Sequence, residues 1–294
     1  MDRPLQPLAG VAWFDVADPQ SSQLDELARR FDLHELQIED CRHPPQRAKA
    51  EEHDHYLFIV FKRLEDPAEI TFSDLPVFLG SDFMITVGGR GAGVLQRAAA
   101  RAGESQPLRL DRILYTLVDA LVDEYLPVLD DFGDATSRIE SDVLIRPDPQ
   151  TLAEIFHLKR RLIEFRRITV AMREVVNAIM RREHGVVGDD LDPYFRDVYD
   201  HLVRTQDLIE TYRDLLTGSL DVYLSAVANR TNEVMKVLTV YGTVALPLVI
   251  ITGFFGMNLR MGWSEHPHGV WYASGLMAVS TGLVLLYFRR KGWF

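Results

Sequence analysis

Hydrophobic positions are spread unevenly along this 294-residue chain, and two runs near its end, residues 237–259 and 269–288, contain no Asp, Glu, Lys or Arg. A bilayer core of about 30 Å requires roughly 20 apolar residues in a helix, and both runs reach that length. A core helix of a soluble protein usually keeps a polar stripe, which neither run has. The pattern therefore predicts two transmembrane helices, and two buried helices of a soluble protein are the alternative.

The residues that flank these runs predict the orientation in the membrane. Basic residues precede the first run and follow the second: Arg230, Lys236, Arg289, Arg290 and Lys291. Between the runs, residues 260–268 contain one basic residue, Arg260. Because basic residues collect on the cytoplasmic side, both termini are expected there, with residues 260–268 as an external loop and 289–294 as a basic tail. The N-terminus has no signal-peptide pattern, so most of the chain is expected to stay in the cytoplasm. With its two spans, the protein is expected to be a multi-pass protein of the cell (inner) membrane.

In the residues before the two apolar runs, the hydrophobic pattern changes once, near residue 110. In residues 1–110, short runs rich in β-branched and aromatic residues alternate with short helical patterns, which predicts an N-terminal cytoplasmic α/β or α+β domain. The predicted strands cover residues 11–16, 56–64, 70–79 and 83–87, and the predicted helices cover residues 22–31 and 34–41. A glycine cluster at residues 88–93 lacks the ending of a phosphate-binding loop, which favours a strand-to-helix turn.

Residues 111–236 are predicted to be a helical stalk region. Apolar residues recur there at three- and four-residue spacing, interrupted at residues 147–149 and again at residues 185–193. The last helix begins near Tyr194 and meets no proline before Pro247. At 1.5 Å per residue, a helix that continues from there to Gly256 would be about 90 Å long, which is too long for a compact domain.

Composition and charge exclude several classes of function. The net charge of −11 argues against nucleic acid as a partner, because nucleic-acid binding favours a basic surface. A single cysteine, Cys41, is consistent with a reducing compartment and excludes an intrachain disulfide. His43, His53 and His55 could suggest a transition-metal site, but the neighbouring prolines favour a solvated loop. No nucleophile with a base and an orienting group emerges, so the chain is not expected to be an enzyme.

The membrane part indicates an oligomer, because two helices without ionisable residues cannot enclose a polar pathway. Any pore must therefore lie between identical subunits. Residues at three- or four-residue spacing form one side of the first run: Asn232, Met235, Thr239, Gly242, Leu246, Val249, Gly253 and Gly256. This side is interpreted as pore lining, and a small-residue face for helix packing is the alternative. At its outer end, a ring of Asn258 carboxamides could hydrogen-bond to the water shell that Mg2+ retains.

Several motifs in this order resemble the CorA family of divalent-cation channels. They are residues 193–200, residues 229–236 and Gly256-Met257-Asn258, and the similarity extends more loosely over nearly the whole chain, including Ile38-Glu39-Asp40. The resemblance implies a homopentamer with a funnel-shaped cytoplasmic domain, a pore lined by the first transmembrane helix, and passive Mg2+ uptake with Co2+ and Ni2+ also admitted. Relatives often carry a hydroxyl at the position of Val249, so the resemblance does not extend to the interior ion sites.

The resemblance also implies roles for individual residues. Asn258 would select ions at the entrance, with Gly256 and Met257 shaping the loop. Asn232, Met235 and Leu238 would line the cytoplasmic end of the pore, the last two as an apolar gate. Regulatory Mg2+ would bind between Asp40 of one protomer and Asp197 of its neighbour, with Glu39 at an adjacent site. Two other functions stay open: proton-coupled Zn2+ transport, as in the related ZntB branch, and a membrane-anchored helical scaffold that does not conduct.

Overall fold

The computed structural model describes residues 12–88, 93–103, 108–145, 147–181, 185–257 and 268–293. It divides into two compact units, residues 1–220 and residues 221–294. The first unit holds a five-stranded mixed sheet in the order β1-β5-β4-β3-β2, in which only the β1–β5 pair is parallel. The strands are β1 Trp13–Val16, β2 Lys49–His53, β3 Tyr56–Asp66, β4 Thr71–Gly80 and β5 Met84–Val87.

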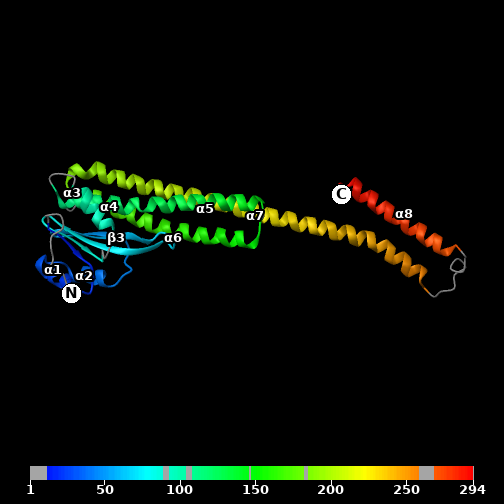
Figure 1. Ribbon diagram of the computed structural model, residues 1–294, viewed down its shortest axis with the longest axis horizontal. Coiled ribbons are helices and arrows are strands. Elements are labelled where there is room, and N and C mark those ends of the chain that lie inside the picture. Colours follow the sequence, from blue (N-terminus) through cyan, green and yellow to red (C-terminus); the bar gives the residue numbers. More distant parts are fainter. Residues whose placement is uncertain are drawn as a thin grey trace. The chain divides into compact units, whose positions relative to one another are not determined.

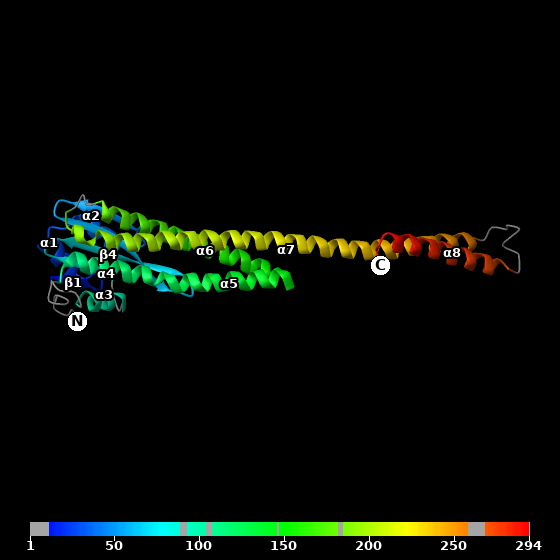
Figure 2. The same ribbon diagram turned by 90° about the horizontal axis from the view of Figure 1, so that it is seen from above.

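The helices of the first unit cover both faces of this sheet or extend beyond it (Figures 1 and 2). They are α1 Ser22–Arg30, α2 Glu35–Arg42, α3 Gly93–Gly103, α4 Leu110–Asp123, α5 Tyr125–Ile145 and α6 Pro149–Met180, followed by a 3-10 turn at Asp189–Leu191 and by the start of α7 Asp192–Phe255. The predicted α+β class is confirmed. Its four predicted strands and two predicted helices are present, with ends that differ from the prediction by one or two residues.

Strand β2 was not predicted. Its sequence, Lys-Ala-Glu-Glu-His, consists of residues with little preference for strands, and four of the five are polar. It forms because it pairs along its whole length with β3, from Lys49 opposite Val60 to His53 opposite Tyr56. As the edge strand of the sheet it carries three charged residues, Lys49, Glu51 and Glu52, and charge on an edge strand discourages further pairing.

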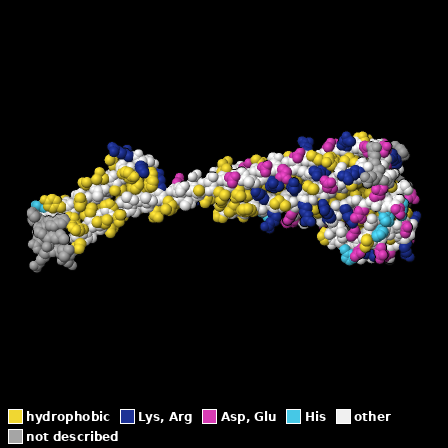
Figure 3. All heavy atoms as spheres, turned by 180° about the vertical axis from the view of Figure 1, so that it is seen from behind, with side chains coloured by type: hydrophobic (Ala, Val, Ile, Leu, Met, Phe, Trp, Pro, Cys, Tyr) yellow, Lys and Arg dark blue, Asp and Glu magenta, His cyan; other side chains and the backbone are white. Residues whose placement is uncertain are grey.

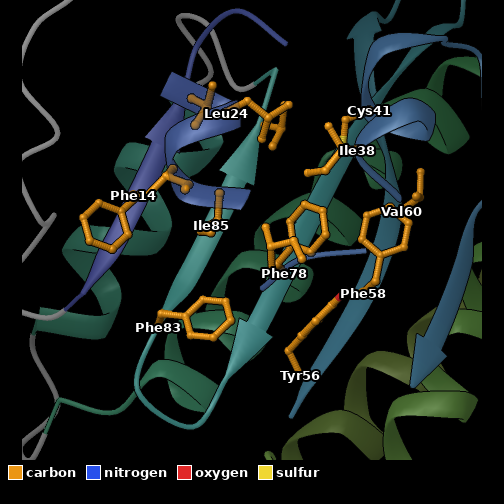
Figure 4. Packing of buried hydrophobic residues seen from close by; sticks show 14 residues of the cluster. Phe14, Leu24, Ile38, Cys41, Tyr56, Phe58, Val60, Phe78, Phe83 and Ile85 are labelled. Atoms are coloured by element: carbon orange, nitrogen blue, oxygen red, sulfur yellow. The ribbon is translucent and has the colours of Figure 1, made fainter. Parts of the chain in front are cut away.

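One hydrophobic core lies between the sheet and helices α1 and α2. Alternate residues of β3, Tyr56, Phe58 and Val60, pack there with Leu24 of α1 and Ile38 of α2, and all of them are buried (Figure 4). The intervening residues of β3 point to the opposite face of the sheet and are buried as well. Burial of both faces explains why β3 reads as a continuous apolar run in the sequence.

A buried ion pair joins β3 and β4 beyond this core. Lys62 and Asp74 are directly opposite each other in the ladder, and their side chains form a 2.5 Å salt bridge with exposed fractions of 8% and 6%. Asp74 also accepts a hydrogen bond from the backbone N–H of Gln46, in the loop after α2. The Lys62 carbonyl accepts a hydrogen bond of 2.7 Å from the Tyr125 hydroxyl. This cluster therefore connects the sheet to α5 and to the loop that follows α2.

The proline break in the helical region starts a helix with a defined cap. Asp148 accepts a hydrogen bond of 2.9 Å from the Thr151 N–H, and Pro149 is the first residue of α6. The predicted long helix is present as α7, which runs unbroken from Asp192 to Phe255 through Gly218, Gly242 and Pro247. An internal proline is tolerated best in a membrane segment, where neighbouring helices can satisfy the freed carbonyl.

The second unit consists of the C-terminal part of α7 and of α8 Gly269–Arg290. Both helices contain an 18-residue window that is long and apolar enough to span a membrane, and only 6% and 0% of these windows is buried. Apolar side chains cover this unit, whereas charged side chains gather on the first (Figure 3). The alternative of two buried helices in a soluble core is therefore wrong for this structure, because these helices bury almost nothing within the protomer.

Candidate functional site

The predicted pore residues from Asn232 to Gly253 lie on α7, and they are exposed on the surface of the protomer. Met235, Leu238, Leu246 and Val249 are between 56% and 65% exposed. Asn232, Gly242 and Gly253 are exposed as well. An apolar face that the described part of the protomer leaves uncovered is available for a neighbouring subunit, for lipid or for an ion pathway.

Helix α7 ends at the predicted selectivity motif. Gly256 donates a hydrogen bond of 2.9 Å to the Thr252 carbonyl, and Met257 donates one of 3.3 Å to the Phe254 carbonyl. A Cβ on Gly256 would lie 2.9 Å from the Thr252 oxygen, so a side chain would require this last turn to shift. Met257 is 51% exposed. Asn258 and all of the predicted external loop except His268 lie outside the described residues.

The carboxylate of Asp40, a predicted metal ligand, is already paired with a positively charged side chain of its own protomer. It lies in the last turns of α2, and its carboxylate forms a 2.7 Å ion pair with the ammonium of Lys49 on β2. The same ammonium contacts Glu51 at 2.7 Å. Burial disfavours the charged form of Lys49, but the hydrogen bonds that the ammonium donates to Asp40 and Glu51 outweigh this effect and raise its pKa. Glu39, the other predicted ligand on α2, is exposed.

Asp197 lies in a different charged environment, on α7 beside α4. Its side chain is 65% exposed and 4.0 Å from the His201 ring. Burial and the neighbouring Asp123 carboxylate raise the pKa of Asp119 on α4, and Asp197 acts in the same direction. The Arg101 guanidinium, which pairs with Asp119 at 2.9 Å, opposes this rise. Asp197 and Asp119 are thus close enough in one protomer to repel each other.

The structure does not gather the predicted ligands into one complete site. Over the described ranges of the chain, no cluster of three or more His, Cys, Asp or Glu side chains has the spacing to hold a metal ion. The histidines are engaged elsewhere: His55 contacts the Phe31 carbonyl at 2.9 Å, and His43 contacts the Glu39 carbonyl at 3.0 Å. Any site that contains both Asp40 and Asp197 therefore needs ligands from water or from another subunit.

The sequence did not reveal that Lys49 pairs with Asp40. It also did not reveal that Asp119 and Asp197, two like charges, lie close enough to interact. Lys49 and Glu51 are two residues apart, a spacing that places both on one face of a strand, but β2 itself was not predicted. Asp119 belongs to an acidic series on α4 and α5 that is readily interpreted as a solvated helix face. Only the packing of α4 against α7, where Tyr115 contacts the rings of Tyr194 and Phe195, brings it near Asp197.

Comparison with known proteins identifies the family of the chain. The family of CorA-like Mg2+ transporter proteins matches residues 9–290. The chain belongs to this family. It is 34% identical over 304 residues to the cobalt/magnesium transport protein CorA of Thermotoga maritima, with 99% of this chain and 85% of that protein covered. Membership of the CorA-like family places the chain among ion transporters and not among enzymes, and supports its location in a membrane.

Solved structures support the fold over the full length of this CorA-like chain. The complete CorA magnesium transporter of Methanocaldococcus jannaschii superimposes with a TM-score of 0.83 at 23% identity, covering 96% of this chain and 91% of that one. The cytoplasmic domain of ZntB from Vibrio parahaemolyticus is more distant, with a TM-score of 0.63 at 12% identity over 74% of this chain and 88% of that one. At sequence identities of 23% and 12%, these two structural similarities are evidence for the fold alone.

Proposed function

We propose that this CorA-like protein is a passive divalent-cation channel that mediates Mg2+ uptake and also admits Co2+ and Ni2+. Five identical subunits would surround one pore, with α7 as its lining and both termini in the cytoplasm. The observation that carries the proposal is the exposed apolar face of α7, which leads to Gly256-Met257-Asn258. The name of the Thermotoga maritima relative, a cobalt/magnesium transport protein, supports the choice of ions.

We further propose that internal Mg2+ closes the channel by binding at subunit interfaces. Asp40 of one protomer and Asp197 of its neighbour would supply the carboxylates, with Glu39 at an adjacent position. Repulsion between these carboxylates would loosen an empty interface, and Mg2+ would favour the closed, symmetric state by its higher affinity for that state. Water would complete the coordination shell, as Mg2+ prefers.

Ion flux into proteoliposomes tests the filter. Purified oligomer is reconstituted, and uptake of Mg2+, Co2+, Ni2+ and Zn2+ is compared for the wild type and Asn258→Ala. The variant is expected to lose most Mg2+ uptake, because the neutral ring that holds the hydrated ion is gone. Substantial uptake with unchanged ion preference would contradict the role of Asn258. Zn2+ flux that follows an imposed pH gradient would favour ZntB-like transport, and absence of all flux would favour a non-conducting scaffold.

The gate has a separate test with a matched control. Apolar constrictions stop conduction by excluding water, so Leu238→Asn is expected to raise uptake at high internal Mg2+. Val237→Asn is the control: Val237 is 54% exposed, Leu238 is 64% exposed, and the two lie about 100° apart around the helix. Equal effects of the two substitutions on uptake would contradict the proposed role of Leu238 in the gate.

A further inference from the structure

The ammonium of Lys49 is held by two carboxylates that approach it from different elements. Asp40 of α2 and Glu51 of β2 each lie 2.7 Å from Nζ, and the ring centre of Phe58 lies 5.5 Å from the same atom. The side chains of Lys49 and Asp40 are 29% and 26% exposed, so ions in solution can reach the pair. The arrangement is a small cation site that the chain fills with its own charge.

A chain of hydrogen bonds connects Glu51, the second carboxylate, to the start of α2. The Gln37 amide donates to Glu51 at 3.5 Å and accepts from the Tyr56 hydroxyl at 2.6 Å, and that hydroxyl accepts from the His34 N–H at 2.9 Å. His34 caps the start of α2, the helix that carries Asp40. The two carboxylates thus belong to connected elements, and Lys49 contacts both of them at once.

From this geometry we infer that Lys49 is an affinity-determining residue of the regulatory site, acting as a tethered competitor of Mg2+ for the Asp40 carboxylate. The inference rests on the proposed role of Asp40 in binding internal Mg2+. A divalent cation that approaches Asp40 must move the ammonium aside, and Glu51 then keeps that ammonium paired. Lys49 therefore raises the internal Mg2+ concentration at which the channel closes, and Glu51 limits how far it is raised.

Two substitutions should shift this threshold in opposite directions. Lys49→Met removes the competitor and is expected to lower the Mg2+ midpoint about fivefold, equivalent to about 1 kcal/mol, the upper range for a partly exposed ion pair. Glu51→Gln leaves the ammonium with Asp40 alone and is expected to raise the midpoint. In the Lys49→Met background, Glu51→Gln should have a clearly smaller effect, because Glu51 acts mainly through Lys49.

The midpoint is measured on the full chain in detergent, as protection from chymotrypsin during a MgCl2 titration at constant ionic strength. Chymotrypsin is chosen because its preferred sites, after Phe, Tyr and Trp, are the same in all of the variants. Lys49→Arg keeps the charge and should keep the wild-type midpoint. Arg47→Gln removes the same charge from an exposed position two residues away and should shift the midpoint less than twofold. Thermal unfolding of each variant establishes that it is folded.

Each outcome decides the inference. A Lys49→Met midpoint equal to that of the wild type, or an Arg47→Gln shift as large as that of Lys49→Met, overturns it. So do equal effects of Glu51→Gln with and without Lys49, which would indicate general electrostatics. If Lys49→Met does not assemble, a Glu51→Gln midpoint that is unchanged or lowered overturns the inference. A wild-type protein without any Mg2+-dependent protection would instead refute the proposed regulation itself, and this inference with it.

Discussion

The buried pair Lys62–Asp74 provides the sharpest test of how the cytoplasmic unit is held together. Asp74→Leu leaves the Lys62 ammonium, 8% exposed, without its partner, and removes the acceptor of the Gln46 N–H. Breaking a buried pair from one side costs about 3–5 kcal/mol, because an uncompensated charge remains in a poorly solvated place. A domain is stable by about 5–15 kcal/mol, so this single substitution would use a large part of that stability.

Hydrogen–deuterium exchange of the full chain in detergent measures this loss strand by strand. A cost of about 4 kcal/mol corresponds to roughly thousandfold faster exchange in peptides from β3 and β4. The matched control is Asp25→Asn, which breaks the surface pair with Arg42, where the side chains are 51% and 26% exposed. Exposed pairs contribute about 0–1 kcal/mol, so the control should change exchange less than about fivefold.

A double substitution separates the unpaired charge from the loss of packing. Lys62→Met combined with Asp74→Leu replaces the pair with apolar side chains and is expected to recover most of the lost protection, because no charge remains buried. The reasoning is wrong if Asp74→Leu accelerates exchange no more than Asp25→Asn. It is also wrong if the double variant is as unstable as Asp74→Leu alone, since the cost would then come from shape and not from charge.

Three further outcomes are expected of the cytoplasmic unit. Thr86→Val should cost about 1–3 kcal/mol in chemical denaturation, because buried Thr86 accepts from the Trp13 indole at 3.3 Å and donates to Asp15 at 2.8 Å. Asp148→Ala should cost about 1 kcal/mol and speed exchange at the start of α6, whereas Asp148→Ser should keep the cap. Burial, more than neighbouring charge, raises the pKa of Asp119 above 3.8, so its ionisation weakens the native state as pH rises. Asp119→Asn should therefore gain stability relative to wild type as the pH rises above about 4, and a pH-independent difference would contradict this assignment.

Local patterns in the sequence determined much of the fold. The charge-free runs predicted the two apolar helices because hydrophobicity over about 20 residues is a property of consecutive positions. The predicted strands were likewise visible as apolar runs. Strand β3, for example, is apolar along most of its length because both of its faces are buried. The break before α6 was visible because Asp148-Pro149 combines a cap residue with the residue preferred at the first helical position.

Only the tertiary structure decided how charged residues are paired. Strand β2 has little preference of its own and exists because β3 offers it hydrogen-bonding partners. That pairing carries Lys49 to Asp40, so a carboxylate that sequence alone presents as a free ligand is already neutralised. In the same way, packing of α4 on α7 places Asp119 beside Asp197. Charge pairing depends on distances between segments far apart in the chain, and these distances follow from packing and not from the order of residues.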